Sequence, residues 1–422
     1  MDPIKNPFSP GAGNRPPELA GRDELLKRAL LALGRIKAGK SERSPLMVGL
    51  RGVGKTVLLV EIRKKAEAAG YKTMMVEAQE GLPLARLLLP GLRKLLLSMD
   101  TGKALGEKVK RGFRVLKSLL SNIKVAVGEV EFRLDSPPEK GAADSGQLES
   151  DLADVFVAIG EAAVENGTAA AIIMDELQYL KEAELSALIM AVHKISQEKL
   201  PLILVGAGLP QLAGNTGRAK SYAERLFVFP QVGALKEEDA GIALQEPVRA
   251  EGVLFTEAAL AETYRQTQGY PYFLQEWGSQ SWNLATQSPI DLDIVREAGK
   301  HSISNLDQSF FRVRFDRLTP REKDYLRALA ELGNSPQRSG EIAEMLGVKS
   351  ESVAPLRAGL IGKGMIYSPQ HGDTAFTVPL FDEFMRRIMP ELPKPKKKSR
   401  RIGRSGPSLR CSPWGHISQF NK

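Results

Sequence analysis

A glycine-rich segment near the start of the chain constrains the fold more than any other feature. Residues 45–59 read PLMVGLRGVGKTVLL, an apolar run followed by the spacing G-x-x-x-x-G-K-T. This pattern lets backbone N–H groups turn inward around a polyphosphate, brings a lysine to the β and γ phosphates and offers a hydroxyl to Mg²⁺. The residues that we expect to form this phosphate-binding loop are Gly49, Leu50, Arg51, Gly52, Val53, Gly54, Lys55 and Thr56.

The residues on either side of the loop have the periodicity that such a site needs. Residues 46–50 are mostly apolar, as in a buried strand, and residues 55–69 carry apolar side chains at helical spacing before Gly70. A helix that begins at Lys55 directs its positive end toward bound anions. This context favours a phosphate-binding loop over an ordinary glycine-rich turn.

A second apolar run, far along the chain, ends in two adjacent acids. Residues 169–174 are uninterrupted hydrophobics, followed by Asp175 and Glu176. Strands buried on both faces of a parallel sheet have this pattern, and their carboxyl ends point at the ligand crevice. We expect Asp175, together with Thr56, to hold Mg²⁺, and Glu176 to orient or deprotonate the attacking water. The alternative is that the two acids only begin a solvated turn.

Strand and helix patterns alternate through the first half of the chain, which predicts an α/β core. Such alternation favours a parallel sheet with helices on both faces. The predicted strands are residues 46–50, 73–78, 169–174 and 202–205, and the predicted helices are residues 24–37, 55–69, 82–97, 148–165 and 182–197.

At 422 residues the chain is longer than one hydrophobic core usually supports, so more than one domain is expected. Strand patterns are missing between residues 236 and 304, which indicates an all-helical module. The expected segments are a flexible leader (1–14), a P-loop core (15–235) with an insertion (101–147), a helical lid (236–310), a winged helix (311–390) and a basic disordered tail (391–422).

The winged helix is predicted from a run of short elements near the C-terminus. Thr319 and Glu322 form a capping box that begins a helix, and a helix-turn-helix pattern follows with its turn at Gly347. Residues 366–368 and 374–378 then supply a two-stranded wing. The second helix would be the DNA-reading element of such a domain.

That second helix offers few residues for reading bases. It carries Arg357 and Lys363, with Glu351 at its start and Pro355 in its first turns. Arginine is a common base-reading residue in the major groove. Double-stranded DNA binding and a structural or protein-contact role therefore stay open for this domain.

The net charge of +9 is unevenly distributed. Residues 391–422 hold nine Lys or Arg against one Glu, a net of +8, so the rest of the chain carries +1. The tail is rich in Pro, Ser and Gly and is expected to be disordered, whether it is simply solvated or contacts nucleic acid or acidic lipid.

The insertion begins with a basic amphipathic helix. The alternatives are a solvated face packed on the core and a contact for nucleic acid or a partner protein. A hairpin at residues 124–127 and 129–134 is predicted to follow. The basic residues of the helix are Lys103, Lys108, Lys110, Arg111, Arg114 and Lys117.

Composition excludes several classes. No apolar run approaches the ~20 residues of a membrane helix, and the N-terminus has no apolar signal region, so a cytoplasmic protein without a membrane partner is expected. Cys411 is the only cysteine, which excludes an intrachain disulfide and a cysteine-rich zinc site.

The order of these features resembles AAA+ ATPases of the origin-recognition initiator type, and also archaeal-type and STAND ATPases, over residues 15–390. The resemblance implies ATP and Mg²⁺ as cofactors. In these relatives the segment equivalent to RPPELAGRDE positions the adenine, which implies that role for Pro16, Leu19, Gly21 and Arg22.

The chain departs from these relatives at two places. Where they carry a polar sensor residue after the fourth strand, this chain has Gly206, Ala207 and Gly208. Where initiators carry a phosphate-sensing arginine in the lid, the sequence Gly269-Tyr270-Pro271 resembles the G-x-P motif of STAND and archaeal ATPases. Arg225 is the candidate arginine finger, with a surface or structural role as its alternative.

The sequence thus predicts an Mg²⁺-dependent ATPase in which Lys55, Glu176 and Arg225 act on ATP, with a nucleotide state that controls the lid and the winged helix. Action on DNA is one form of this hypothesis. The alternatives are a STAND-type switch or slow-hydrolysing regulator that acts through protein partners, and an inactive scaffold. A homo-oligomer is compatible with each.

Overall fold

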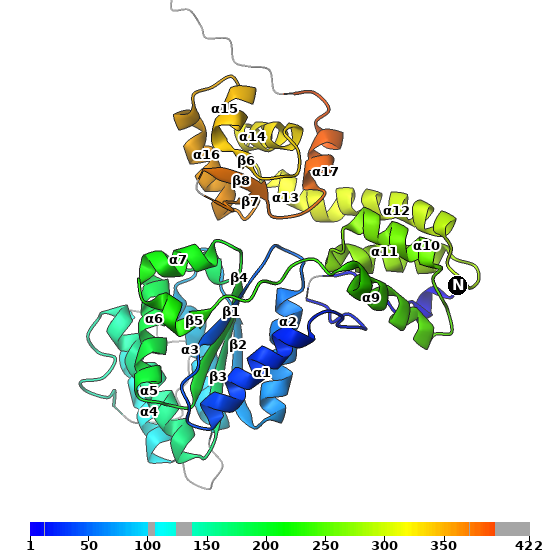
Figure 1. The fold of residues 1–422 in the computed structure, drawn as a ribbon. Coiled ribbons are helices and arrows are strands. Elements are labelled where there is room, and N and C mark those ends of the chain that lie inside the picture. Colours follow the sequence, from blue (N-terminus) through cyan, green and yellow to red (C-terminus); the bar gives the residue numbers. More distant parts are fainter. Residues whose placement is uncertain (12, 100–105, 124–136, 371, 393–422) are drawn as a thin grey trace, which may run out of the picture.

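The computed structural model describes residues 1–11, 13–99, 106–123, 137–370 and 372–392. Figure 1 shows an α/β core, a group of helices beside it and a small C-terminal domain above the core. The predicted hairpin in the insertion and the basic tail lie outside the described residues. No helix in the described part of the chain is long and apolar enough to cross a membrane.

The core is built on a five-stranded sheet in the order β2-β3-β4-β1-β5, with all neighbouring pairs parallel. The predicted fold class, a P-loop sheet covered by helices, is confirmed. The strands are β1 (Ser44–Val48), β2 (Tyr71–Glu77), β3 (Ala169–Asp175), β4 (Leu202–Gly208) and β5 (Phe227–Val228).

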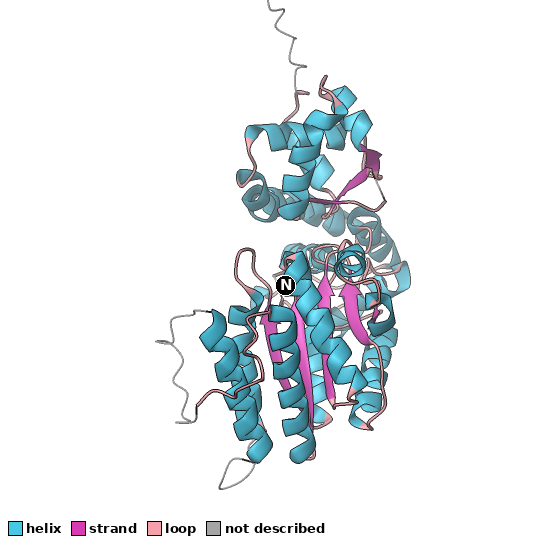
Figure 2. Ribbon diagram, turned by 90° about the vertical axis from the view of Figure 1, so that its left-hand side faces the viewer, coloured by secondary structure: helices cyan, strands magenta, loops and turns pink. Residues whose placement is uncertain are grey.

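Helices cover both faces of this sheet, and Figure 2 shows its strands lying among these helices. Alternate residues of β3 enter different cores: Ile172 packs with the helices of one face and Ile173 with those of the other. The helices are α1 (Asp23–Lys37) and α2 (Lys55–Ala68) on one side, and α3 (Leu84–Ser98), α4 (Glu107–Ile123), α5 (Leu148–Glu165) and α6 (Glu182–Gln197) on the other.

The predicted elements of the core match the observed ones to within two residues at every end but one, as expected where periodicity is strong. The exception is β4, which was predicted to end at residue 205 and continues to Gly208. Small residues hide the strand signal there, although every residue of β4 is buried. The short elements after β4 are α7 (Leu212–Ala219) and α8 (Ala223–Leu226), and η3 (Leu177–Tyr179) follows β3.

The region after the core is helical, as predicted, and packs around its own apolar cluster. Phe255 and Ile290 add one isolated parallel bridge between loops. The helices are α9 (Glu237–Ala250), α10 (Glu257–Thr267), α11 (Pro271–Leu284) and α12 (Leu292–Leu306). A π-helical turn, η4 (Asp307–Phe311), joins α12 to α13 (Arg312–Asp316).

The C-terminal domain has the predicted winged-helix arrangement, and Thr319 and Glu322 form the expected capping box. Its sheet has three antiparallel strands in the order β6-β8-β7, one more than predicted, because β6 is only two residues long. The elements are α14 (Pro320–Glu331), β6 (Gln337–Arg338), α15 (Ser339–Met345), α16 (Ser350–Gly362), β7 (Ile366–Tyr367), β8 (Asp373–Phe376) and α17 (Phe381–Ile388).

The leader differs from the expected flexible segment, because it packs against α11. Phe8 is 5% exposed and lies so close to Gly278 that a Cβ there would be 2.7 Å from the Phe8 ring. Asn6 Nδ2 donates to Ser279 and to Asn283, at 3.1 and 2.9 Å. Sequence periodicity could not reveal this, since these partners lie more than two hundred residues apart.

Phe8→Ala is expected to destabilise the helical region by about 3 kcal/mol, because it removes a buried aromatic side chain. Trp277 and Trp282 lie on α11, so tryptophan fluorescence during urea unfolding measures this region. Ile4→Ala is the matched control, because Ile4 is 94% exposed, and it should leave the midpoint unchanged. Equal midpoints for both variants would contradict the packing of the leader.

Candidate functional site

A cavity of about 250 Å³ lies where the carboxyl ends of the strands meet the helical region. Three parts of the chain supply most of its lining: the leader and the segment before α1, the predicted phosphate-binding loop, and the junction of α11 with η4 and α13. Glu176, Leu235 and Ala243 complete it. The loop residues in its wall are Arg51, Gly52, Val53, Gly54, Lys55 and Thr56. Gly49 and Leu50 do not line the cavity, although their carbonyl groups accept hydrogen bonds from Lys55.

The loop has the backbone that the glycines predict. Gly52 and Gly54 adopt φ values of 81° and 90°, a region that L side chains rarely enter, and Gly54 directly precedes α2. Gly52 also meets the helical region, because a Cβ there would lie 2.9 Å from the Tyr270 ring. The N-terminus of α2 therefore opens into the cavity with its backbone donors exposed to an anion.

Lys55 places an ammonium group at the end of the loop. Its side chain is buried, and Nζ donates to the carbonyls of Leu50 at 2.7 Å and Gly49 at 3.0 Å. Burial lowers the pKa of Lys55, and the carboxylates of Glu176 and Asp175 oppose that shift. An ammonium group held at this position meets the requirement for a counter-charge to phosphate.

Thr56 and Asp175 meet across the site although 119 positions separate them. Thr56 Oγ1 donates to Asp175 Oδ2 at 2.5 Å, and burial raises the pKa of Asp175. Among the described residues, no group of three or more His, Cys, Asp or Glu side chains is placed to hold a metal ion. One hydroxyl and one carboxylate fit Mg²⁺, which usually takes its remaining ligands from phosphates and water.

Glu176 lies in the cavity wall beside the loop. It adopts a left-handed backbone conformation, φ 54°, which is uncommon for a residue with a side chain and concentrates at functional sites. Its Oε2 accepts a hydrogen bond from Gln178 Nε2, and Gln178 Oε1 accepts from the backbone N–H of Leu209 at 3.0 Å. Gln178 thus connects Glu176 to the end of β4.

This connection explains the small residues at the end of β4, where the relatives carry a polar sensor. A Cβ at Gly206 would lie 2.4 Å from Leu177, and one at Gly208 would lie 2.9 Å from Gln178. The space for a sensor side chain is taken by η3. Sequence reasoning missed Gln178, whose one signal was its position two residues after Glu176.

The four residues predicted to surround the adenine divide into two groups. Pro16, Leu19 and Arg22 line the cavity, whereas Gly21 is not in its wall. A Cβ at Gly21 would lie 2.6 Å from Asp239 of α9. Arg22 donates to the carbonyls of Val53 at 3.1 Å and Gly233 at 2.6 Å, and burial lowers its pKa against the opposing charge of Asp239.

Arg225 lies apart from these residues. It is exposed on α8, immediately before the edge strand β5, and does not line the cavity. The described structure therefore does not bring Arg225 together with the other predicted site residues in the cavity.

The winged helix contacts the phosphate-binding loop directly. Arg51 donates its backbone N–H to the Thr377 carbonyl at 3.3 Å, and a Cβ at Gly364 would lie 2.5 Å from the Arg51 guanidinium. Arg51 Nη2 also donates to the Tyr179 hydroxyl at 2.6 Å. One P-loop residue therefore joins the core to the C-terminal domain.

The two cationic side chains of the predicted DNA-reading helix form hydrogen bonds and an ion pair within the winged helix. Arg357 donates to Thr374 Oγ1 at 2.9 Å, and to Ser368 Oγ and the Asp373 carbonyl at 2.7 Å each. Lys363 Nζ pairs with Glu322 at 2.7 Å. These contacts favour a structural role for both side chains over base reading.

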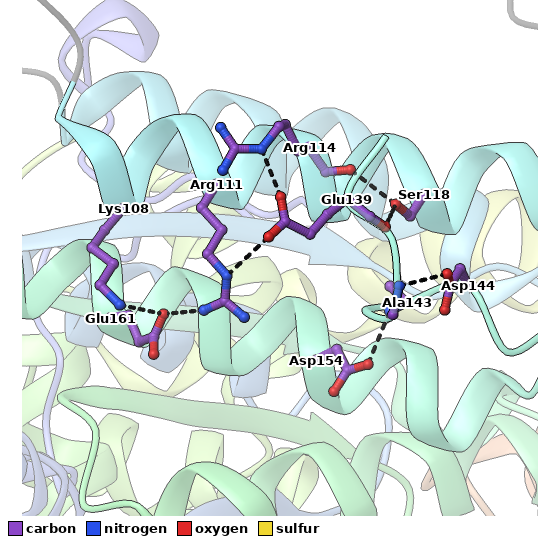
Figure 3. A network of polar contacts seen from close by, with 10 residues as sticks. Lys108, Arg111, Arg114, Ser118, Glu139, Ala143, Asp144, Asp154 and Glu161 are labelled. Carbon is purple, nitrogen blue, oxygen red and sulfur yellow. Dashed lines mark hydrogen bonds and ion pairs between the residues drawn. The ribbon is translucent and has the colours of Figure 1, made fainter. Parts of the chain in front are cut away.

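Cationic side chains of the basic helix α4 likewise bond within the protein, as Figure 3 shows. Lys108 and Arg111 pair with Glu161 on α5, and Arg114 pairs with Glu139 at 2.6 Å. The apolar face of α4 is buried in the core. These ion pairs favour a helix packed on the core over a nucleic-acid contact, and Lys103 lies outside the described residues.

Comparison with known proteins agrees with this site. Residues 18–205 match the family AAA ATPase domain, and residues 308–385 match a domain of unknown function (DUF8462). None of the curated proteins matches the chain. Among solved structures, the Walker-type ATPase PABY2304 of Pyrococcus abyssi aligns with a TM-score of 0.56 at 16% identity, over 87% of this chain and 96% of that one.

Two further solved structures align less well. The Holliday junction branch migration motor RuvB of Thermotoga maritima has a TM-score of 0.44 at 15% identity, over 86% of this chain and 95% of that one. The Orc1 protein of Aeropyrum pernix, in complex with DNA, has a TM-score of 0.45 at 17% identity, over 92% and 96%. The family match and the P-loop fold together show that residues 18–205 form an AAA ATPase domain.

Proposed function

We propose that this protein binds ATP with Mg²⁺ at the phosphate-binding loop and hydrolyses it. One observation carries the proposal: Lys55, Thr56 and Glu176, from parts of the chain far apart in sequence, line one cavity, and Asp175 accepts a hydrogen bond from Thr56. Lys55 and Thr56 begin α2, Asp175 ends β3, and Glu176 follows it directly. The AAA ATPase domain match supports the same activity.

The binding roles follow from the geometry. The loop N–H groups and Lys55 hold the phosphates, and Thr56 with Asp175 holds the metal. Bound Mg²⁺ would supply charge neutralisation between phosphate oxygens. Pro16 and Leu19 offer an apolar surface to the adenine, while Arg22 holds the loop through the Val53 carbonyl rather than contacting the base.

We assign the activation of water to the second acid, Glu176. Glu176 orients or deprotonates the attacking water, and Gln178 fixes the position of that carboxylate through its hydrogen bond. Arg225 acts only in an assembly, where a neighbouring copy presents it to the site.

The test is calorimetric titration of the full chain with ATP, with MgCl₂ or with EDTA. We expect one ATP per chain and a loss of affinity of roughly tenfold or more in EDTA, because the phosphate charge is then neutralised by protein cations alone. Equal affinity with and without Mg²⁺ would contradict the metal roles of Thr56 and Asp175. No binding under either condition would contradict the whole proposal.

A second candidate function is a nucleotide switch that acts through a protein partner. The contact of Arg51 with Thr377 and Gly364 supports it, because a nucleotide that moves the loop would also move the winged helix. The internal bonds of Arg357 and Lys363 support it over base reading. In this function slow hydrolysis resets the switch.

A further inference from the structure

The leader forms part of the wall of the nucleotide cavity. Four of its residues, Ser9, Gly11, Gly13 and Asn14, line the cavity together with the phosphate-binding loop. None of them belongs to the segment RPPELAGRDE, in which the adenine-positioning residues were expected, and all four precede the matched AAA ATPase domain, which begins at residue 18. The leader therefore adds a part to the site that neither the sequence motifs nor the family match assigns.

Before it reaches the cavity, the leader is anchored on α11 of the helical region. Beyond the contacts described above for this segment, Trp282 Nε1 donates to the Asp2 carbonyl at 2.8 Å, and the backbone N–H of Ser9 donates to Gln275 Oε1 at 3.3 Å. Gln275 itself lines the cavity, and Figure 1 shows the N-terminus beside the helical region. The leader thus runs along α11 toward the end of that helix that opens on the cavity.

Beyond the cavity, the leader meets the first turns of α2. A Cβ at Gly13 would lie 3.8 Å from Cγ2 of Thr56. Two residues later, Arg15 forms an ion pair with Glu61 of α2 at 3.5 Å. The leader therefore crosses the site from the helical region to the helix that begins at the phosphate-binding loop.

The leader residues at the cavity are suited to contact a ligand. Gly13 adopts φ 74°, a conformation that L side chains rarely adopt, and a glycine lets the backbone approach a ligand closely. The side chain of Asn14 is exposed and makes no hydrogen bond within the described part of the chain, although an amide group can donate two hydrogen bonds and accept two. Hydrogen-bonding capacity is therefore left unused one residue from the contact with Thr56.

We propose that the leader binds the nucleotide, with Asn14 as its hydrogen-bonding side chain and Gly13 as the point of close backbone approach. The inference rests on the proposed ATP site and extends it to residues outside the family domain. Because Gly13 lies beside Thr56, the group that Asn14 contacts is an oxygen of the ribose or of the phosphates rather than the base. A bound nucleotide then contacts both α2 and the leader, and it opposes detachment of the leader from α11.

The first test is calorimetric titration of the full chain with the non-hydrolysable Mg-AMPPNP. In Gly13→Ala we expect the affinity to fall about tenfold, because alanine disfavours the left-handed backbone and displaces the segment from the ligand. Gly39→Ala is the matched control and should bind as the wild type does. Gly39 has φ 72°, a Cβ there would meet nothing within 4 Å, and the residue does not line the cavity.

Asn14→Ala tests the side chain without straining the backbone. We expect the affinity for Mg-AMPPNP to fall about fivefold, as for the loss of one or two neutral hydrogen bonds. Asn334→Ala is its matched control, because Asn334 is exposed between α14 and β6 and does not line the cavity. The control should leave the affinity unchanged.

Trypsin cleavage measures the leader itself. Lys5 is exposed in the anchored part of the leader, and Lys40 is exposed in the loop after α1. Saturating Mg-AMPPNP should slow cleavage after Lys5 by about fivefold, because cleavage requires the leader to detach, and should leave cleavage after Lys40 unchanged. Mass spectrometry of the fragments gives both rates.

These experiments separate the role of the leader from the ATP site. A wild type that binds no nucleotide overturns the ATP site itself. A wild type that binds, with either leader variant matching its control, overturns only the role of the leader, and so does cleavage after Lys5 that the nucleotide does not slow selectively. If Gly13→Ala does not fold, Asn14→Ala and the cleavage rates decide.

Discussion

Glu176→Gln is expected to lower the steady-state rate of ATP hydrolysis by about 10²–10⁴-fold, because glutamine has the shape of glutamate but cannot accept a proton from water. The residue lies in the cavity wall immediately after β3, in a left-handed conformation, and Gln178 holds its carboxylate. ATP affinity should stay within a factor of about two, because Glu176 acts on the transition state rather than on binding. Phosphate release and calorimetry measure the two quantities.

Glu182→Gln is the matched control for this experiment. Glu182 is exposed at the start of α6, so its substitution should leave turnover unchanged. Wild-type turnover in Glu176→Gln would show that another group activates water. The structure offers one: Glu77 ends β2, pairs in register with Asp175, and has a raised pKa, chiefly from burial and then from Asp175 and Glu176.

Lys55→Ala is expected to weaken ATP binding by roughly 100-fold, equivalent to about 3 kcal/mol, because it removes charge-assisted hydrogen bonds to phosphate. The ammonium is already buried beside the Leu50 carbonyl, so no side-chain ordering is required when phosphate binds. Hydrolysis should fall with binding. The measurement is calorimetric titration with Mg-ATP.

Lys64→Ala separates this effect from a general loss of positive charge. Lys64 is exposed on the same helix, α2, and its removal should change the ATP dissociation constant by less than about twofold, as expected for a solvated charge. Matching affinities for Lys55→Ala and the wild type would mean that the loop does not hold the phosphates.

The core and the positions of most candidate site residues could be predicted because their signals are local. The glycine spacing, the helical period after Lys55 and the apolar run before Asp175 each lie within a few residues. Parallel strands then bring these carboxyl ends to one edge of the sheet. Periodicity also placed the winged helix, since its caps and turns are encoded by neighbouring residues such as Thr319 and Glu322.

The residues that surround this centre could not be predicted in the same way. Gln178 and the packed leader acquire their roles from contacts with distant segments, which no spacing rule encodes. The function of the basic residues could not be inferred from their number either. A count of charge suggests nucleic acid, yet Arg111, Arg357 and Lys363 are each bonded inside the protein. Arg111 and Lys363 neutralise acids of the fold, and Arg357 donates to hydroxyl and carbonyl oxygens.

ATP hydrolysis by the full chain, measured with and without double-stranded DNA, tests the central claim most directly. We expect Mg²⁺-dependent phosphate release that Glu176→Gln abolishes. An increase on adding DNA would assign the activity to DNA, and an unchanged rate would direct the search to protein partners. Tight ATP binding with no phosphate release under either condition would contradict the account, because the four converging residues would then hold a nucleotide without hydrolysing it.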